Sequence, residues 1–196
     1  MEQSQISVKN MERSTKKEIR AIVKKNRREA TPEQIRENSN EICKQFLNLP
    51  EYKEAKVVFA YMDCKNEVET KMVIEQCWRD GKTVAVPKVF GEIMKYYVIT
   101  SYDDLEEGYF GIPEPKHEQL NEIVCDDGLM ILPGVAFDIC RHRVGYGGGF
   151  YDRYLEAHPD MKKIAFAFEF QMFESVPFEV FDRQPEKIIT EKRIII

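Results

Sequence analysis

The sequence predicts an α/β fold of three layers, in which a mostly parallel, Rossmann-like sheet carries helices on both faces. Short apolar runs rich in β-branched residues alternate with helical patterns along the chain, which is the order typical of parallel sheets with crossover helices. Residues 56–86 contain one complete strand-helix-strand unit. At 196 residues, the chain is long enough to bury the core of one such domain.

The first two elements are expected to be helices. One begins at Ser14, where apolar side chains recur at spacings of three and four, and the other begins at Thr31, an N-cap residue followed by Pro32. The second helix is expected to end near Pro50. Their buried faces are predicted to be Ile19, Ile22 and Val23 in the first helix and Ile35, Ile42, Phe46 and Leu49 in the second.

The remaining elements follow from apolar runs and their boundaries. Residues 101–116 are rich in glycine and proline and are expected to form an irregular surface segment. Residues 1–13 are expected to be a flexible segment ahead of a single domain spanning 14–196. Strands are predicted at residues 56–62, 82–86, 93–100, 129–132, 164–168 and 187–196, and helices at 70–80 and 150–157.

The composition narrows the class of protein. A hydrophobic fraction of 43% and a charged fraction of 32% are typical of soluble globular chains. No apolar run approaches the roughly 18–20 residues that span a bilayer, and the start of the chain lacks the apolar segment of a signal peptide, so a cytoplasmic protein is expected. Five cysteines without a C-x-x-C pair indicate neither a disulfide framework nor a thiolate zinc site.

The net charge of −5 argues against general binding of nucleic acid. The charge is nevertheless uneven, because residues 16–28 carry a stripe of lysines and arginines with Glu18 as the sole acid. The acidic total and the lack of interleaved aromatic residues argue against an RNA-binding helix. Without further information, this stripe is a solvated basic helix face.

A glycine-rich loop spans residues 145–149, between an apolar strand and the helix expected from Phe150. Glycine in ordered structure costs roughly 0.5–1 kcal/mol relative to alanine, so the cluster indicates a turn that requires positive φ or a ligand that approaches the backbone. Free N–H groups at a helix N-terminus suit a phosphate. No standard nucleotide-binding motif matches the loop, so both interpretations remain open at this point.

Asp152 lies in the first turn of the helix that follows the loop. An acidic residue there often only stabilises the helix dipole, by about 0.3–1 kcal/mol. Beside a phosphate site, a carboxylate is also where Mg²⁺ binds, because this ion combines one or two carboxylates with phosphate oxygens and water.

Several segments of the chain resemble one enzyme family. Residues 132–138 (LPGVAFD) and 143–154 (RVGYGGGFYDRY) resemble the signature of the 5-formyltetrahydrofolate cyclo-ligases, also called 5,10-methenyltetrahydrofolate synthetases. Further resemblances occur in order along the chain, at residues 16–20 (KKEIR), 67–70 (EVET), 111–115 (GIPEP) and 188–191 (IITE). The resemblance implies ATP- and Mg²⁺-dependent conversion of 5-formyltetrahydrofolate into 5,10-methenyltetrahydrofolate, ADP and phosphate, through phosphorylation of the formyl oxygen and attack by N10.

The resemblance also implies a role for each matching residue. The implied ATP-binding residues are Lys16, Lys17, Arg20, Arg143, Val144, Gly145, Tyr146, Gly147, Gly148, Gly149, Phe150 and Tyr151, with Arg143 and Lys16 also catalytic. The implied folate-binding residues are Cys64, Glu67, Glu69, Phe110, Tyr146, Gly148 and Phe150, and the implied Mg²⁺ ligands are Asp152 and Asp182. The implied partners are small molecules, without nucleic acid or membrane, and the protein is expected to be a monomer.

The chain departs from some relatives within the glycine loop. They carry basic residues where this chain has Tyr146 and Gly148, which shifts charge neutralisation toward Lys16, Arg20 and Arg143. The three histidines have no metal-ligand spacing and are assigned no catalytic part.

Two other classes of function remain alternatives. One is a non-catalytic regulator that binds folate or nucleotide. The other is a sugar-phosphate isomerase or transferase that uses the glycine loop for the phosphate of its substrate. Simpler roles are also open for Glu67 and Glu69 as a solvent-facing acidic pair and for Phe110 as a packing residue.

Overall fold

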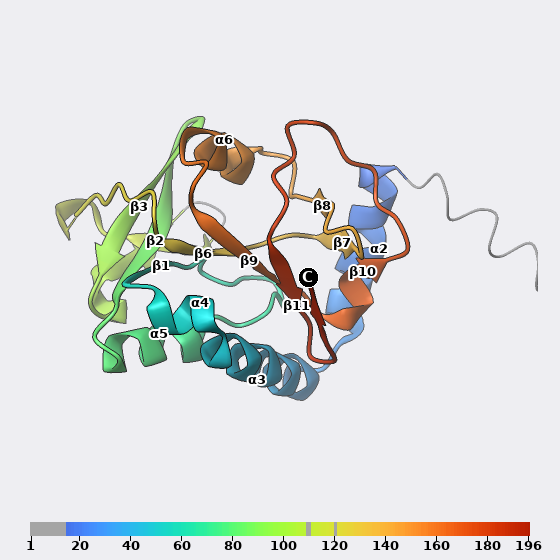
Figure 1. Ribbon diagram of the computed structural model, residues 1–196, viewed down its shortest axis with the longest axis horizontal. Coiled ribbons are helices and arrows are strands. Elements are labelled where there is room, and N and C mark those ends of the chain that lie inside the picture. The colour runs from blue at the N-terminus through green and yellow to red at the C-terminus, as the bar shows by residue number, and fades with distance from the viewer. Residues whose placement is uncertain (1–14, 109–110, 120) are drawn as a thin grey trace, which may run out of the picture.

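The computed structural model describes residues 15–108, 111–119 and 121–196. Seven strands form the central sheet in the order β12-β11-β9-β6-β1-β2-β3 (Figure 1). The five strands from β11 to β2 are mutually parallel, and β12 and β3 are antiparallel edge strands. The bounds are β1 (Val57–Phe59), β2 (Thr83–Phe90), β3 (Ile93–Ile99), β6 (Leu129–Leu132), β9 (Lys162–Phe166), β11 (Lys187–Ile189) and β12 (Ile194–Ile195).

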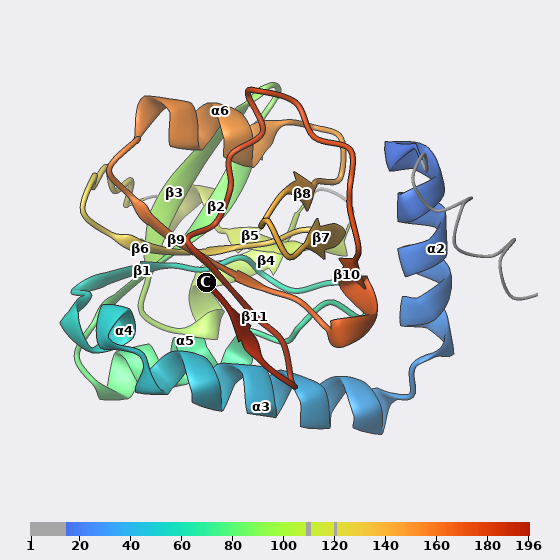
Figure 2. The same ribbon diagram turned by 45° about the vertical axis from the view of Figure 1, so that its right-hand side comes forward.

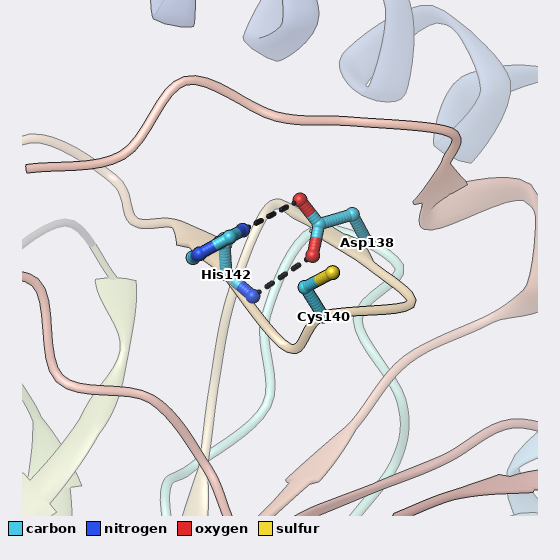
Figure 3. Close-up of side chains that lie close together, drawn as sticks. All are labelled: Asp138, Cys140 and His142. Atoms are coloured by element: carbon cyan, nitrogen blue, oxygen red, sulfur yellow. Dashed lines mark hydrogen bonds and ion pairs between the residues drawn. The ribbon is translucent and has the colours of Figure 1, made fainter.

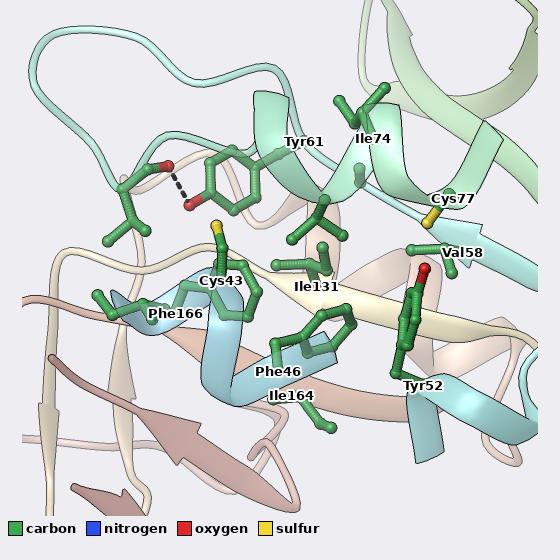
Figure 4. Close-up of a cluster of buried hydrophobic side chains, with 14 of the residues drawn as sticks. Cys43, Phe46, Tyr52, Val58, Tyr61, Ile74, Cys77, Ile131, Ile164 and Phe166 are labelled. Carbon is green, nitrogen blue, oxygen red and sulfur yellow. Dashed lines mark hydrogen bonds between the residues drawn. The ribbon is translucent and has the colours of Figure 1, made fainter. Parts of the chain in front are cut away.

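Helices cover both faces of this sheet, so the predicted three-layer α/β class is confirmed (Figure 1). On one face lie α3 (Pro32–Asn48), α4 (Pro50–Glu54) and α5 (Lys71–Arg79), and on the other lies α6 (Phe150–Ala157). The core beneath α3 is built around Phe46, whose ring meets that of Phe166 edge-on at 5.1 Å (Figure 4). Ile35, Ile42 and Phe46 are buried as predicted, whereas Leu49 is only partly buried.

Helix α2 (Lys16–Glu29) lies beside the sheet instead of on one of its faces (Figure 2). Its apolar face packs against a second, three-stranded sheet in the order β10-β7-β8, with bounds β7 (Ala136–Asp138), β8 (Arg143–Val144) and β10 (Met172–Phe173). Ile19 and Val23 are buried there as predicted. The prediction for Ile22 is wrong, since this residue is 44% exposed, and Arg27 is buried on the helix instead.

Several elements differ from the prediction in their bounds. The strand predicted at 56–62 is limited to Val57–Phe59, the one predicted at 82–86 extends to Phe90, and the one predicted at 164–168 spans Lys162–Phe166. Helix α4 and the strands of the second sheet were not predicted.

Two further segments differ in kind. Within 101–116, residues expected to be irregular, β4 (Leu105–Glu107) pairs with β5 (Pro113–Pro115) after the short η2 helix (Tyr102–Asp104). Residues 187–196 form an antiparallel pair instead of one strand, because the Thr190 hydroxyl accepts the N–H groups of Lys192 and Arg193 and turns the chain. The other short helices are η4 (His117–Gln119) and η5 (Glu169–Gln171). The flexible segment predicted for residues 1–13 lies outside the described residues.

The strand order determines where a ligand binds. From β1 the chain passes to β2 on one side and later returns to β6 on the other side of β1. Ligands of open α/β sheets bind outside the carboxyl ends of the strands at such a reversal. The loop after β1, at residues 60–70, and the segment after β6, at 133–149, both leave these ends. In the part of the chain that the structure describes, no helix is long and apolar enough to cross a membrane.

Candidate active site

One face of α2 carries cations toward the glycine loop. Lys16, Arg20 and Arg27 lie on one stripe of the helix, spaced four and seven residues apart, together with the buried Val23. Arg20 Nε donates a hydrogen bond to the carbonyl oxygen of Gly145 at 2.8 Å. Lys17 is exposed and lies off this stripe. The basic stripe is therefore not simply a solvated face, because its inner side holds the loop.

Arg27 is a site residue that the sequence interpretation missed. It is 7% exposed, and its guanidinium donates to the Tyr146 hydroxyl at 2.6 Å and to the carbonyl oxygen of Gly134 at 3.2 Å. Its Nη1 also lies 3.6 Å from the carboxylate of Glu67. The position of Arg27 on the stripe of Lys16 and Arg20 is the signal that could have identified it.

The Tyr146 hydroxyl joins Arg27 to Glu67, because it donates its proton to the Glu67 carboxylate. The tyrosine as a whole residue is 53% exposed, while its hydroxyl is hydrogen-bonded to both charged groups. Burial and the charge of Glu67 raise the pKa of Tyr146 well above its ordinary value. Tyr146 is therefore a neutral donor, and it connects the glycine loop to both α2 and the loop after β1.

Arg143 and Asp152 form an ion pair at the other end of the loop. Arg143 is 4% exposed on β8, and its Nη2 lies 2.5 Å from Oδ1 of Asp152. The same carboxylate oxygen accepts the backbone N–H of Arg183 at 2.9 Å. Arg143 also donates to the carbonyl oxygen of Pro133 at 3.3 Å. Asp152 thus connects α6 to the buried arginine and to the segment around residue 183.

Lys16 and Asp182 form a second ion pair. Lys16 Nζ lies 2.7 Å from Oδ2 of Asp182 and 3.3 Å from Glu179. Asp182 Oδ2 also accepts the backbone N–H of Glu179 at 2.8 Å. Because Asp182 and Arg183 are consecutive, the two ion pairs lie on the same segment of chain. Each of the two predicted metal ligands therefore holds one of the two predicted catalytic cations.

The glycine loop has the backbone that its composition predicts. Gly147 has φ of +108°, a value that L side chains rarely adopt. A Cβ on Gly148 would lie 2.6 Å from a ring carbon of Phe150, so this position requires a close approach. Gly149 is the N-cap of α6 and offers no side-chain acceptor to the N–H groups of the first turn. These groups and the helix dipole favour an anion at the end of the loop.

The predicted folate residues lie on two sides of this region. Cys64 and Glu67 lie in the turn after β1, where the Cys64 N–H donates to Glu67 at 3.0 Å. Burial and the charge of Glu67 raise the pKa of Cys64 to about 11, so the thiol stays neutral. Glu67 is buried and Glu69 is partly buried, so they are not a solvent-facing pair. Phe110 lies outside the described residues.

Phe150 and Tyr151 follow the loop on α6, and both are partly buried. Val144 belongs to the apolar cluster under α2, so its side chain is structural. A pocket of about 390 Å³ lies beside α6 and is lined by Phe150, Arg153 and residues of β3. Among the described folate-site predictions, Phe150 is the residue that lines it. The pocket therefore lies next to the glycine loop but does not unite the predicted substrate residues.

Comparison with known proteins shows which family this chain resembles. The model of the 5-formyltetrahydrofolate cyclo-ligase family matches residues 12–191. The chain belongs to this family. Membership makes it a ligase of folate metabolism, as the sequence resemblance predicts.

Curated relatives of this cyclo-ligase chain match over nearly their whole length. A probable 5-formyltetrahydrofolate cyclo-ligase from Schizosaccharomyces pombe is 32% identical, over 92% of this chain and 97% of the relative. The 5-formyltetrahydrofolate cyclo-ligase from Escherichia coli K12 is 28% identical, over 88% and 98% of the two chains.

Solved structures of the family share the fold. The NMR structure of 5,10-methenyltetrahydrofolate synthetase from Aquifex aeolicus has a TM-score of 0.81 and 32% identity, with 91% of each chain covered. The structure of a 5,10-methenyltetrahydrofolate synthetase from Mycoplasma pneumoniae has a TM-score of 0.72 at 21% identity, over 91% of this chain and 99% of that one.

Proposed function

We propose that this cyclo-ligase closes the ring of 5-formyltetrahydrofolate in an ATP- and Mg²⁺-dependent reaction that gives 5,10-methenyltetrahydrofolate, ADP and phosphate. The observation that carries the proposal is the pair of ion pairs around the glycine loop, Arg143 with Asp152 and Lys16 with Asp182. A site for MgATP needs cations for phosphate and carboxylates for the metal, and these four side chains supply both.

The reaction explains why phosphate must be handled. N10 can attack the carbon of the N5-formyl group, but the formyl oxygen would then have to leave as hydroxide, a poor leaving group. Transfer of the γ-phosphoryl group to that oxygen makes the carbon more electrophilic. After N10 attacks, the oxygen leaves with the phosphate. The protein therefore has to align two substrates and stabilise charge on the phosphoryl group.

The backbone of the glycine loop and the first turn of α6 are proposed to hold the ATP phosphates. Arg20 fixes the loop through Gly145, and Arg27 fixes it through Tyr146, so that its N–H groups are oriented before ATP binds. Such preorganised donors stabilise charge in the transition state without further reorganisation. Lys16 and Arg143 are proposed to neutralise the phosphate oxygens.

The carboxylates fit a magnesium ion. In the described residues, hydrogen bonds fall on Oδ1 of Asp152 and on Oδ2 of Asp182, which leaves the second oxygen of each to a metal. Bound Mg²⁺ would neutralise and orient the ATP phosphates. The charge of that ion would also weaken the hold of each carboxylate on its cation. Arg143 and Lys16 would then exchange a carboxylate for a phosphate.

The folate is proposed to bind between the turn after β1 and the start of α6. Glu69 and Phe150 are proposed to contact it, whereas Glu67, which is bound to Arg27 and Tyr146, positions the loop. The neutral thiol of Cys64 is proposed to contact the substrate without acting as a nucleophile.

The arrangement of the whole protein is also a proposal. Residues 14–196 are proposed to act as one domain, as a monomer in the cytoplasm. The name of a relative from Arabidopsis thaliana places that protein in mitochondria, so the compartment differs between members.

The proposed reaction is tested by following the absorbance of the methenyl product with the full chain, 5-formyltetrahydrofolate, ATP and Mg²⁺. Product is expected only with all components, and Arg143→Ala should lower the rate at least 100-fold, the scale of losing one charge-stabilising donor (about 10²–10³). Arg141→Ala, a matched loss of charge two residues away, should keep the rate. Absence of ATP-dependent product from the wild type refutes the proposal, and binding without turnover favours a regulator.

A further inference from the structure

We propose that Asp138, Cys140 and His142 form a binding site for one divalent transition-metal cation of the zinc class, separate from the proposed magnesium site. Asp138 ends strand β7, and Cys140 and His142 lie in the turn that leads to β8 (Figure 3). One ligand atom from each residue lies within 4.8 Å of the ligand atoms of the other two. Among the residues that the structure describes, this is the one group of three histidine, cysteine or acidic side chains placed closely enough to hold a metal ion.

Two of the three proposed metal ligands, Asp138 and His142, already contact each other. His142 Nδ1 lies 2.9 Å from Oδ2 of Asp138, and the backbone N–H of His142 donates to Oδ1 at 3.0 Å (Figure 3). The Cys140 side chain projects from the same turn toward the carboxylate (Figure 3). A single turn of five residues therefore supplies a carboxylate, an imidazole and a thiol to one point.

The surroundings hold the Asp138 carboxylate and the His142 ring in place without a metal. Asp138 is 2% exposed, and its Oδ2 also accepts the N–H of Val176 at 3.1 Å. The His142 ring stacks on Phe178, with centroids 3.7 Å apart and planes within 2° of parallel. Arg141 has φ of +66°, which brings the ends of the turn together. Binding would therefore order little additional structure, and hydrogen bonds to metal ligands raise affinity.

The donor set selects the class of metal. Imidazole and thiolate suit zinc and neighbouring transition metals, whereas Mg²⁺ and Ca²⁺ prefer oxygen alone. Two ligands about 2.0–2.1 Å from a tetrahedral metal stand about 3.3 Å apart, so the Asp138 and His142 atoms need to separate by roughly 0.4 Å. Cys140 is exposed, which leaves room for water as a fourth ligand.

Binding has a defined proton balance. The Cys140 thiol must lose its proton to solvent, because the thiolate is the ligand. The His142 ring must carry its proton on Nε2, since Nδ1 would give its lone pair to the metal. No oxidation or reduction takes place, and the proposed ligase reaction is not required for this site.

The spacing of cysteines and histidines along the sequence does not predict this group, because it contains only one residue of each type. Its donors are three different residue types at spacings of two, and the turn that joins them depends on burial of Asp138. His142 directly precedes Arg143 in the sequence, but Arg143 is not one of the three proposed metal ligands.

The test uses Co²⁺ as the probe, added to the reduced, metal-free full chain. We expect a thiolate-to-cobalt charge-transfer band that saturates at one equivalent and disappears when Zn²⁺ is added, but not when Mg²⁺ is added. Cys140→Ser should abolish the band. His142→Gln should weaken Co²⁺ binding by at least the roughly 10–100-fold that outer-shell changes cost.

Matched controls remove a thiol or an imidazole that also contacts an aspartate elsewhere. Cys125 donates to Asp127 at 3.0 Å, and His158 lies 2.6 Å from Asp126. Cys125→Ser and His158→Gln should keep the band. Circular dichroism of each variant without metal shows whether it is folded, and Cys140→Ser changes an exposed position. No band in the wild type, or an unchanged band in Cys140→Ser, overturns the proposal.

Discussion

Replacing Tyr146 with phenylalanine removes only the hydroxyl that joins Arg27 to Glu67, so the change in stability measures the contribution of that group. Two hydrogen bonds to charged groups are lost, and such bonds contribute about 1.5–3 kcal/mol each. The direct approach of Arg27 and Glu67, at 3.6 Å, remains and recovers part of this energy. We therefore expect Tyr146→Phe to lower the free energy of unfolding by about 2–3 kcal/mol.

Equilibrium urea denaturation near neutral pH measures this change. A loss of 2–3 kcal/mol corresponds to a fall in Tm of about 4–12 °C in a chain of this size. The matched control is Tyr102→Phe, because the Tyr102 hydroxyl makes a long, exposed contact of 3.5 Å with the Lys71 carbonyl. This control should stay within about 0.5 kcal/mol of the wild type. Equal stability of the two variants would refute the role of the Tyr146 hydroxyl.

The raised pKa of Tyr146 adds a pH dependence with a definite sign. In the unfolded chain the phenol loses its proton near pH 10, its ordinary pKa of about 10, while in the folded chain it keeps the proton to higher pH. The stability that it contributes is fully present below about pH 10 and is lost as the pH rises toward the folded pKa. The difference between wild type and Tyr146→Phe should therefore shrink above about pH 10. A constant difference would contradict the raised pKa.

Three further predictions follow from local contacts. Gly148→Ala should destabilise the chain by about 1–3 kcal/mol, because its methyl would meet the ring of Phe150; an unchanged urea midpoint would contradict the close approach. Cys64, with its pKa raised to about 11, should be alkylated by iodoacetamide roughly 100-fold more slowly than a free thiol at neutral pH. Peptide mass spectrometry measures this rate, and labelling of Cys64 as fast as a free thiol would refute the raised pKa. Lys187 lowers the pKa of Glu51 through a hydrogen bond of 2.5 Å, so Glu51→Gln should lower the free energy of unfolding near neutral pH. This loss should become progressively smaller as the pH falls below the ordinary glutamate pKa of about 4.3. An equal loss near neutral pH and below about pH 4.3, measured by urea denaturation, would refute the pairing.

Elements with strong local signals were predictable from the sequence. The strand at residues 129–132 and the helix at 150–157 match their predicted bounds, because an apolar run and a glycine cluster mark their ends. The prediction of one strand at 187–196 is wrong, because the apolar residues on both sides give no sign of the turn that the Thr190 hydroxyl stabilises. Side-chain capping of this kind leaves little trace in a hydrophobic pattern.

The sequence predicts which residues belong to the candidate site better than it predicts which of them contact one another. Arg143 and Asp152 were both singled out, but their pairing depends on how β8 meets α6. Arg27 was missed because its three contacts come from Glu67, Gly134 and Tyr146, which only the tertiary fold brings together. Local spacing predicts a helix face, whereas long-range packing decides which of its charges are buried.

The most direct test of the proposed MgATP site is the affinity for ATP measured by calorimetry with and without Mg²⁺. The account predicts that Mg²⁺ strengthens ATP binding to the wild type. In Asp152→Asn and Asp182→Asn this strengthening should be lost, while binding of Mg²⁺-free ATP stays equal or tighter because Arg143 and Lys16 are released. Variants that keep the full effect of Mg²⁺, or that lose Mg²⁺-free binding while folded, would contradict the exchange of carboxylate for phosphate.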